Sequence, residues 1–164
     1  MSEPRNLDQS NGYWGRILHV DLSSGEIHHE ELPDAFYERF LGGIGLAAKI
    51  LWDRIPVGAD PMGPDNMLGF VPGLLTDTGS LFTGRFMVAG KSPSTGGWAD
   101  ANCGGYFSPF LKRCRIDGLF VRGSSEAPVY LLLDEQGAEI RDASELWGLD
   151  TTSTEAKLKE LHGI

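Results

Sequence analysis

The stretch Thr83–Phe107, TGRFMVAGKSPSTGGWADANCGGYF, contains the sharpest change of pattern in the sequence. Its first part, RFMVAG, is apolar enough for a buried strand. The fifteen residues that follow, KSPSTGGWADANCGG, include four glycines and show no apolar periodicity. Loops of that length are uncommon in compact domains unless they have a function or are disordered. We therefore expect a strand that leads into a long functional loop.

Upstream of this stretch, the pattern predicts a β-hairpin, two helices and a strand. GRILHVDLSSGEIHHEEL alternates apolar and polar residues on both sides of its SSG turn. PDAFYERFLGGIGLAAKILWDRIP has helical spacing, with a break at its GG pair and a second helix over about residues 45–54. A loop rich in proline and glycine then leads to MLGFVPGLL, a buried strand that is expected to end near Pro72.

Downstream of the stretch, short elements follow closely on one another. YFSPFLKRCRI predicts a short helix, and DGLFVRG, PVYLLLD and AEIRD predict three strands. Thr152 and Glu155 have the spacing of a capping box and are expected to open a final helix in TTSTEAKLKELHG. Repeated strands with segregated helices indicate the α+β class. We expect a β-rich domain with short helices packed against the sheets.

The composition is that of an acidic globular protein. A chain of 164 residues is long enough for one domain with a core, and its formal net charge of −9 argues against a nucleic-acid partner. No apolar run approaches the roughly 18 residues of a membrane span, and the first residues lack a secretion signal, so we expect a cytoplasmic protein. We expect residues 1–12 to form a flexible tail and residues 13–164 to form one domain. That domain is expected to be incomplete, because no strand follows the final helix.

The cysteines and histidines do not form a metal-binding pattern. Cys103 and Cys114 are the two cysteines, and without a CxxC motif they cannot by themselves hold a four-thiolate iron–sulfur cluster or a structural zinc ion. In a cytosolic chain we expect both to be free thiols. His19 and His28 flank a predicted turn, which favours positions on the surface of strands.

The glycine-rich segment is suited to a close approach between backbone and a flat ligand. Glycines at 96, 97, 104 and 105 allow positive φ and lack Cβ atoms, and exposed amides there can hold phosphates or pterin edges. Arg85 and Lys91 lie just upstream, and we expect the strand to bring both to one end of the sheet. Arg85 would bind a phosphate through two hydrogen bonds, and Lys91 would act as a point charge.

Structural roles are also open for these residues. Arg85 fits a solvated strand position, Asn102 fits a turn whose side chain bonds local backbone, and Trp98 and Tyr106 fit core packing. Between residues 85 and 122, six basic residues stand against two acidic ones, a local balance of +4 that suits an anion site. LGGIG is not a GxGxxG motif and GPDNMLG is not a Walker motif, so a nucleotide phosphate loop is not expected.

These motifs together resemble the N-terminal domain of the tungsten-containing aldehyde:ferredoxin oxidoreductase family. The resemblance runs in one order through GYWGRILHVDLSSGEI, LGGIGLAAKILWD, DPMGPDN, TGRFMVAGKSPSTGG, ANCGGYFSPFLK, DGLFVRGSSEAPVYLLL and EIRDASELWG. It implies a β-rich base that carries a bis-pterin tungsten or molybdenum cofactor, with a magnesium ion bridging the pterin phosphates. The implied reaction is the oxidation of aldehydes to carboxylic acids with ferredoxin as electron acceptor.

The resemblance also implies roles for particular residues. Arg85 matches the arginine that contacts pterin, and Gly104 matches the glycine beside it. Asn102 matches the asparagine that contacts pterin and whose backbone carbonyl helps to bind magnesium. Cys103 and Gly105 belong to the same cofactor-cradling loop. No catalytic acid, base or nucleophile is identified.

Two departures from the family pattern keep alternatives open. Ile44 stands where the family usually has an arginine, a variant that also occurs in the tungsten subunit of benzoyl-coenzyme A reductases. The cysteines for the family's [4Fe-4S] cluster, its second pterin-binding segment and its substrate cavity lie beyond this chain, so we expect the remaining domains or a cluster-carrying chain as partner. The alternatives are a domain of a benzoyl-coenzyme A reductase-like enzyme and a non-catalytic scaffold or assembly module.

Overall fold

The computed structural model describes residues 12–164, in which strands and helices follow one another in irregular order. The strands are β1 (Arg16–Asp21), β2 (Glu26–Glu31), β3 (Met67–Pro72), β4 (Phe86–Lys91), β5 (Trp98–Cys103), β6 (Leu119–Arg122), β7 (Val129–Asp134) and β8 (Gly137–Asp142). The helices are α1 (Asp34–Phe40), α2 (Ile44–Arg54), α3 (Phe107–Arg113) and α4 (Thr151–His162). Within the described range, no helix is long and apolar enough to cross a membrane.

The tail predicted for residues 1–12 lies outside the described residues except for its last member. Gly12 is buried, and its carbonyl accepts a hydrogen bond from Lys112 Nζ at 3.2 Å. The folded part of the chain therefore includes Gly12.

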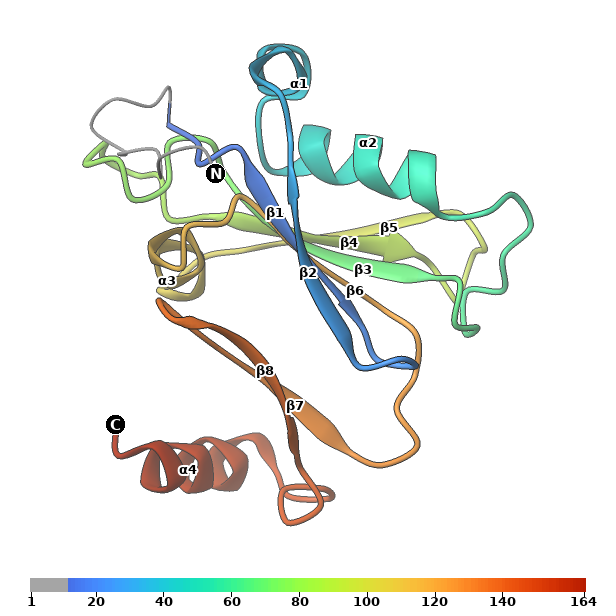
Figure 1. Ribbon diagram of the computed structural model, residues 1–164, viewed down its shortest axis with the longest axis vertical. Coiled ribbons are helices and arrows are strands. Elements are labelled where there is room, and N and C mark those ends of the chain that lie inside the picture. Colours follow the sequence, from blue (N-terminus) through green and yellow to red (C-terminus); the bar gives the residue numbers. More distant parts are fainter. Residues whose placement is uncertain (1–11) are drawn as a thin grey trace.

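The main sheet has six strands in the order β2-β1-β6-β3-β4-β5 (Figure 1). β1 and β6 run parallel, and every other pair of neighbours is antiparallel. β7 and β8 form a separate antiparallel pair. Because β5 pairs with β4 alone among the described strands, the predicted functional segment forms one edge of the main sheet.

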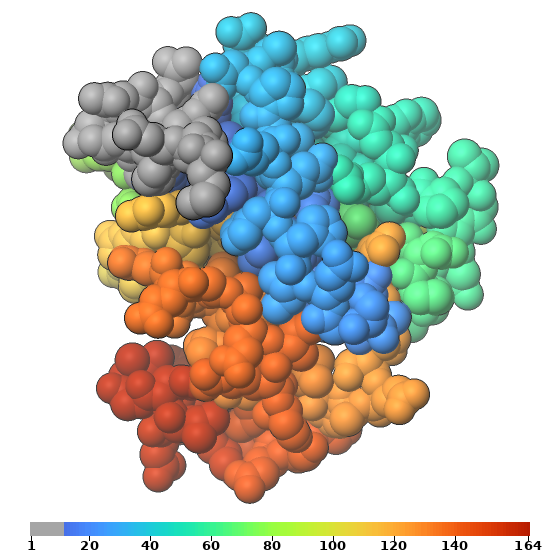
Figure 2. Space-filling model, viewed as in Figure 1, coloured from blue at the N-terminus to red at the C-terminus, as the bar shows by residue number. Residues whose placement is uncertain are grey.

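Each face of the main sheet carries its own hydrophobic cluster. On one face, residues of α1 and α2 such as Tyr37 and Ile50 pack against Ile17, Val71 and Phe120 of the sheet. On the other face, α3 and the β7–β8 hairpin cover strand residues of β1 and β6. Figure 1 shows α2 on one side of the sheet and the hairpin on the other, and the space-filling view shows the orange and red C-terminal segment forming one end of the molecule (Figure 2). The domain thus has three layers.

Most of the predicted elements are confirmed, including the first hairpin, the paired helices with a break between them, and the three strands after α3. The prediction of a long functional loop is wrong. Residues 98–103 form β5, which joins β4 through a short turn closed by Ser92 N donating to Gly97 O at 2.8 Å. The strand escaped notice because its apolar positions hold only Ala99, Ala101 and Cys103, which are too small to produce a clear hydrophobic alternation.

The final helix differs from its prediction at its start and in its packing. Its N-cap is Asp150, whose carboxylate accepts from Ser153 N at 2.7 Å, and not Thr152. The two positions compete because both side chains can cap, and the aspartate lies where the backbone is still extended. α4 has no buried residue, so it is α1, α2 and α3 that supply the helical part of the core.

His19 does not lie on the surface, contrary to the prediction. β1 is covered on both sides, and only 5% of His19 is exposed. Its Nε2 lies 2.8 Å from Glu30 Oε2, and its ring stacks on those of His28 and Phe120. His28 lies on β2 and is exposed, as predicted.

Candidate functional site

The start of β4 and the end of β5 bring Arg85 and Asn102 together. Arg85 precedes β4, and Asn102 pairs with Met87, two residues along that strand. Arg85 Nε donates to Asn102 Oδ1, and one terminal guanidinium nitrogen lies 3.4 Å from the backbone carbonyl of Asn102. Both residues are exposed, so the pair presents a positive charge and amide groups to the outside.

The pair rests on a buried methionine. Asn102 Nδ2 donates to Met87 Sδ at 3.0 Å, and only 7% of Met87 is exposed. Gly43, the N-cap of α2, lies on the same face, because a Cβ on it would stand 3.8 Å from Met87 Cγ. Ile44, the first residue of α2, is half exposed there. The start of α2 therefore borders the Arg85–Asn102 pair.

The four glycines of the segment serve two separate places. Gly96 and Gly97 belong to the β4–β5 turn, where Gly96 has φ 70° and donates to Ser92 O. Gly104 and Gly105 follow β5 and lead to α3. Gly105 has φ 104°, a conformation that favours glycine. Gly104 has no positive φ, and a Cβ on it would meet nothing within 4 Å. Nothing in the described chain therefore requires glycine at position 104.

Two other predicted site residues lie away from the pair. Lys91 ends β4 while Arg85 precedes it, so the expectation that both lie at one end of the sheet is wrong. The Lys91 ammonium donates to the carbonyl of Ala59. Cys103 pairs with Phe86 and, because neighbours on a strand point to opposite faces, it lies on the opposite face from Asn102.

The basic residues of the segment do not gather into one patch. Lys112 is buried against Asp117, Arg113 pairs with Asp77 at 3.4 Å, and Arg122 pairs with Asp21 at 2.8 Å. The local charge balance of +4 is thus distributed over separate contacts. Trp98 and Tyr106, expected in the core, are 44% and 82% exposed.

Residues that the sequence did not single out hold the loop after β5 in place. Ser108, fully buried on α3, donates from its hydroxyl to Gly84 O at 2.9 Å, next to Arg85. Asp117 accepts hydrogen bonds from the backbone of Trp14 and Gly15, from the Tyr37 hydroxyl and from Lys112 of α3. A lone aspartate before a strand gives no signal of this role in the sequence. These contacts fix α3, and with it the loop, against the sheet.

The donor set at this place suits binding of an anion and not acid–base chemistry. Within residues 12–164, no group of three or more His, Cys, Asp or Glu side chains is placed to hold a metal ion. Both cysteines are free thiols, as predicted, and burial, with the nearby Asp134 and Glu135, raises the pKa of Cys114. The available groups are the Arg85 guanidinium, the Asn102 amide and carbonyl, and open backbone at residues 104 and 105.

These groups fit a phosphate-bearing cofactor. An exposed guanidinium can bind a phosphate through two hydrogen bonds, and a carbonyl oxygen keeps a lone pair for a hard cation while it accepts one long contact. The open space beside Gly104 leaves room for a flat group against the backbone. The Arg85 and Asn102 groups and the space beside Gly104 are thus what makes the site suitable for a phosphate-bearing cofactor.

The family model of the aldehyde ferredoxin oxidoreductase N-terminal domain matches residues 17–164 of this chain. The chain belongs to this family. The tungsten-containing aldehyde ferredoxin oxidoreductase of Thermococcus kodakarensis is 45% identical over 149 residues, which are 91% of this chain and 25% of that protein. The aliphatic sulfonate oxidoreductase WOR-like subunit of Pyrococcus furiosus is 32% identical over 92% of this chain and 24% of its own length.

A solved structure confirms the α+β fold of this family member. The active-site complex BamBC of benzoyl coenzyme A reductase, determined with 1,5-dienoyl-CoA, matches with a TM-score of 0.90 and 38% identity. The match covers 93% of this chain and 23% of that one. This aldehyde ferredoxin oxidoreductase N-terminal domain therefore spans about a quarter of the length of the relatives that it matches.

Proposed function

We propose that this domain supplies part of the cofactor cradle of a tungsten or molybdenum bis-pterin oxidoreductase. The proposed enzyme oxidises aldehydes to carboxylic acids and passes the electrons to ferredoxin. The observation that carries the proposal is the Arg85–Asn102 pair beside an open glycine backbone, in a chain 45% identical to a tungsten-containing aldehyde ferredoxin oxidoreductase. We place the enzyme in the cytoplasm, where the two free thiols would stay reduced.

In this proposal each residue has a role in binding. Arg85 holds a pterin phosphate, and the backbone carbonyl of Asn102 is a ligand of magnesium. Gly104 and Gly105 let the pterin approach the backbone, with Cys103 between them and Asn102. Lys91, six residues after Arg85 at the other end of β4, stays outside this cradle. The metal–pterin group supplies the redox chemistry when bound, and the protein binds and orients it.

The rest of the proposed enzyme supplies what these residues lack. A [4Fe-4S] cluster, the second half of the pterin site and the substrate cavity are assigned to the remaining domains or to a separate chain. Ferredoxin or another redox partner would dock on that part. The isolated chain is then expected to be inactive.

A benzoyl-coenzyme A reductase-like enzyme is the second candidate. The TM-score of 0.90 with the BamBC complex supports it, as does Ile44, which places an aliphatic side chain at the start of α2 beside the Arg85–Asn102 pair. The cradle would have the same role in both enzymes, and the substrate would change from an aldehyde to an aromatic thioester.

The test is metal retention in the assembled enzyme after Arg85→Ala and, separately, Asn102→Asp. We expect both variants to lose most of their tungsten or molybdenum, because Arg85→Ala removes a phosphate ligand and Asn102→Asp places a carboxylate against the Arg85 guanidinium, which neutralises the charge offered to the phosphate. Arg113→Ala, an exposed arginine paired with Asp77, is the matched control and should keep its metal. Equal metal content in all four proteins would overturn the site.

A further inference from the structure

The face of the main sheet that carries β7 and β8 is only partly covered. The hairpin packs through Leu131 and Leu133 on the half of this face formed by β1 and β6. Among the described residues, the other half, formed by β3, β4 and β5, has no second layer of strands over it, and α3 covers only its end, where Phe107 packs against Phe70 and Phe86 (Figure 1). Cross-strand partners share a face, so the pairing register identifies the side chains of this uncovered half.

The uncovered half is apolar along all three strands. Phe70 pairs with Val88, which pairs with Ala101, and Gly90 pairs with Ala99. We call these residues, together with Leu68 and Cys103, the outer floor. Leu68 is 44% exposed although it stands on a middle strand, and Ala101 and Cys103 are exposed. The opposite face of β5 carries Trp98, Asp100 and Asn102, so the apolar character belongs to one face only.

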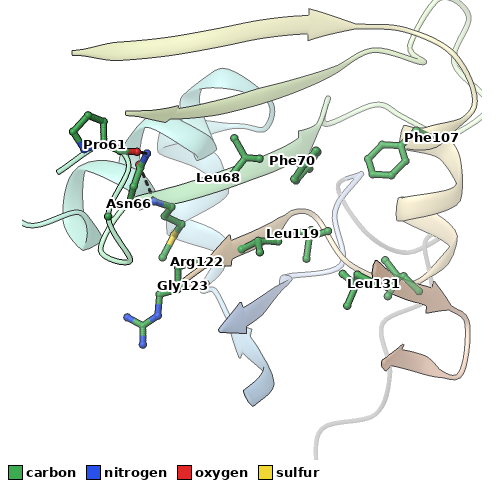
Figure 3. Close-up of a pocket in the computed structure, with 13 residues that line it drawn as sticks. Pro61, Asn66, Leu68, Phe70, Phe107, Leu119, Arg122, Gly123 and Leu131 are labelled. Atoms are coloured by element: carbon green, nitrogen blue, oxygen red, sulfur yellow. Dashed lines mark hydrogen bonds between the residues drawn. The ribbon is translucent and has the colours of Figure 1, made fainter. Parts of the chain in front are cut away.

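The outer floor continues into a hollow of about 560 Å³ beside the hairpin. Figure 3 shows Leu68, Phe70 and Leu119 of the sheet and Leu131 of β7 around it, with Phe107 of α3 at one end. The hollow therefore lies between the outer floor and the place where the hairpin packs on the sheet.

The polar groups at the far end of the hollow are already paired. Asn66 donates to the carbonyls of Pro61 and Lys91 and accepts from the backbone of Met67, and Arg122 is bound to Asp21. The amide of Asn66 is therefore fully used, and Asp21 neutralises the charge of Arg122. An apolar surface with a satisfied polar rim fits protein side chains better than a phosphate-bearing group.

We propose that the outer floor is the docking surface for the remaining polypeptide of the enzyme, which lays apolar side chains on it. The relatives contain further polypeptide that could occupy this surface, because the matched region is only about a quarter of the length of each. The small side chains of Ala99 and Ala101 let that polypeptide approach the backbone closely. The inference rests on family membership and not on the proposed cofactor chemistry.

The test is the labelling rate of a cysteine placed on the outer floor, resolved by mass spectrometry of the peptides. Ala101→Cys reports the floor, and Ala99→Cys repeats the test on the same face. Asp100→Cys, one residue away and exposed on the opposite face, reports whether slower labelling in the enzyme is confined to the floor face. Each variant is measured as the isolated 164-residue chain and in the assembled enzyme, the latter from cells grown with and without tungsten.

We expect the floor cysteines to react readily in the isolated chain and about tenfold more slowly, or slower still, in the assembled enzyme. The slowing should be the same with and without tungsten. Equal rates in the chain and the enzyme would overturn the proposal. Slower labelling that occurs only in enzyme from cells grown with tungsten would overturn the proposal, because the cofactor would then be what covers the floor. Labelling of the isolated chain that slows as its concentration rises would also overturn it, because a second copy would then cover the floor.

Discussion

Gly104 and Gly105 are neighbours with different reasons for being glycine. Gly105 has φ 104°, so an added Cβ would be strained by the backbone itself. Gly104 has neither that conformation nor an atom within 4 Å of an added Cβ. A requirement for glycine at position 104 would come from a bound group.

Substituting the two glycines separately should therefore change different properties, stability in one variant and metal content in the other. Gly105→Ala is expected to lower the free energy of unfolding of the chain by about 1–2 kcal/mol because of the strained backbone. Gly104→Ala should change it by no more than about 0.5 kcal/mol but should reduce the tungsten content of the assembled enzyme. Denaturant unfolding and metal analysis check the two effects. Full metal content in Gly104→Ala would contradict the role of this backbone.

His19 makes the stability of the domain depend on pH. Burial lowers the pKa of His19 below its ordinary value of 6.5, and the nearby Arg54 and His28 lower it further, while Glu30 acts in the opposite direction. The unfolded chain therefore binds a proton at a pH where the folded chain does not. The contribution of His19 is fully present above about pH 6.5 and is lost as the pH falls toward the folded-state pKa.

We expect the chain to lose stability between about pH 7 and pH 5, and His19→Gln to lose less over the same range. Part of the dependence should remain, since burial also lowers the pKa of His29. Denaturant unfolding at several pH values measures both proteins. An unchanged pH dependence in His19→Gln would show that His19 takes up its proton in the folded state.

At the scale of elements, β5 marks the limit of what the sequence reveals. Large apolar residues made β1, β3 and β4 predictable, and the GG pair between α1 and α2 made the helix break predictable. Ala99, Ala101 and Cys103 alternate correctly but are small, and they lie between two glycine pairs that indicate loops. The pairing of β1 with β6 joins segments about a hundred residues apart, and no local pattern encodes it.

The candidate site was likewise predicted only in part from the sequence. The resemblance identified Arg85 and Asn102, and the structure brings them into contact. Spacing alone put Arg85 and Lys91 together, and this failed because a six-residue strand separates them. Asp117 was missed because four of its five hydrogen-bond donors come from distant parts of the chain.

Asp117 joins the N-terminal segment, α1 and α3 to the start of β6. Asp117→Asn should destabilise the chain by about 3–5 kcal/mol, because it leaves the buried Lys112 ammonium without its counter-charge. Tyr37→Phe removes one donor from the same carboxylate and should cost only about 1 kcal/mol. Denaturant unfolding of the two variants compares them directly. Equal losses would mean that the ion pair adds nothing beyond one hydrogen bond.

At the scale of the whole molecule, the two proposals use different faces of one sheet. The Arg85–Asn102 pair lies at the edge of the face that carries α2, and the outer floor lies on the face that carries the β7–β8 hairpin. A domain arranged in this way can hold a cofactor at one edge while it packs against further polypeptide on one side. At this edge of an acidic chain with a net charge of −9, Arg85 supplies a local positive charge for an anion.

The most direct measurement of the central claim is the metal and pterin content of the protein purified without oxygen from its native host. Every chain that co-purifies with it would be identified by mass spectrometry. The account predicts tungsten or molybdenum in fixed proportion to this domain, together with pterin and iron in the same assembly. A pure chain or complex free of tungsten, molybdenum and pterin would contradict it.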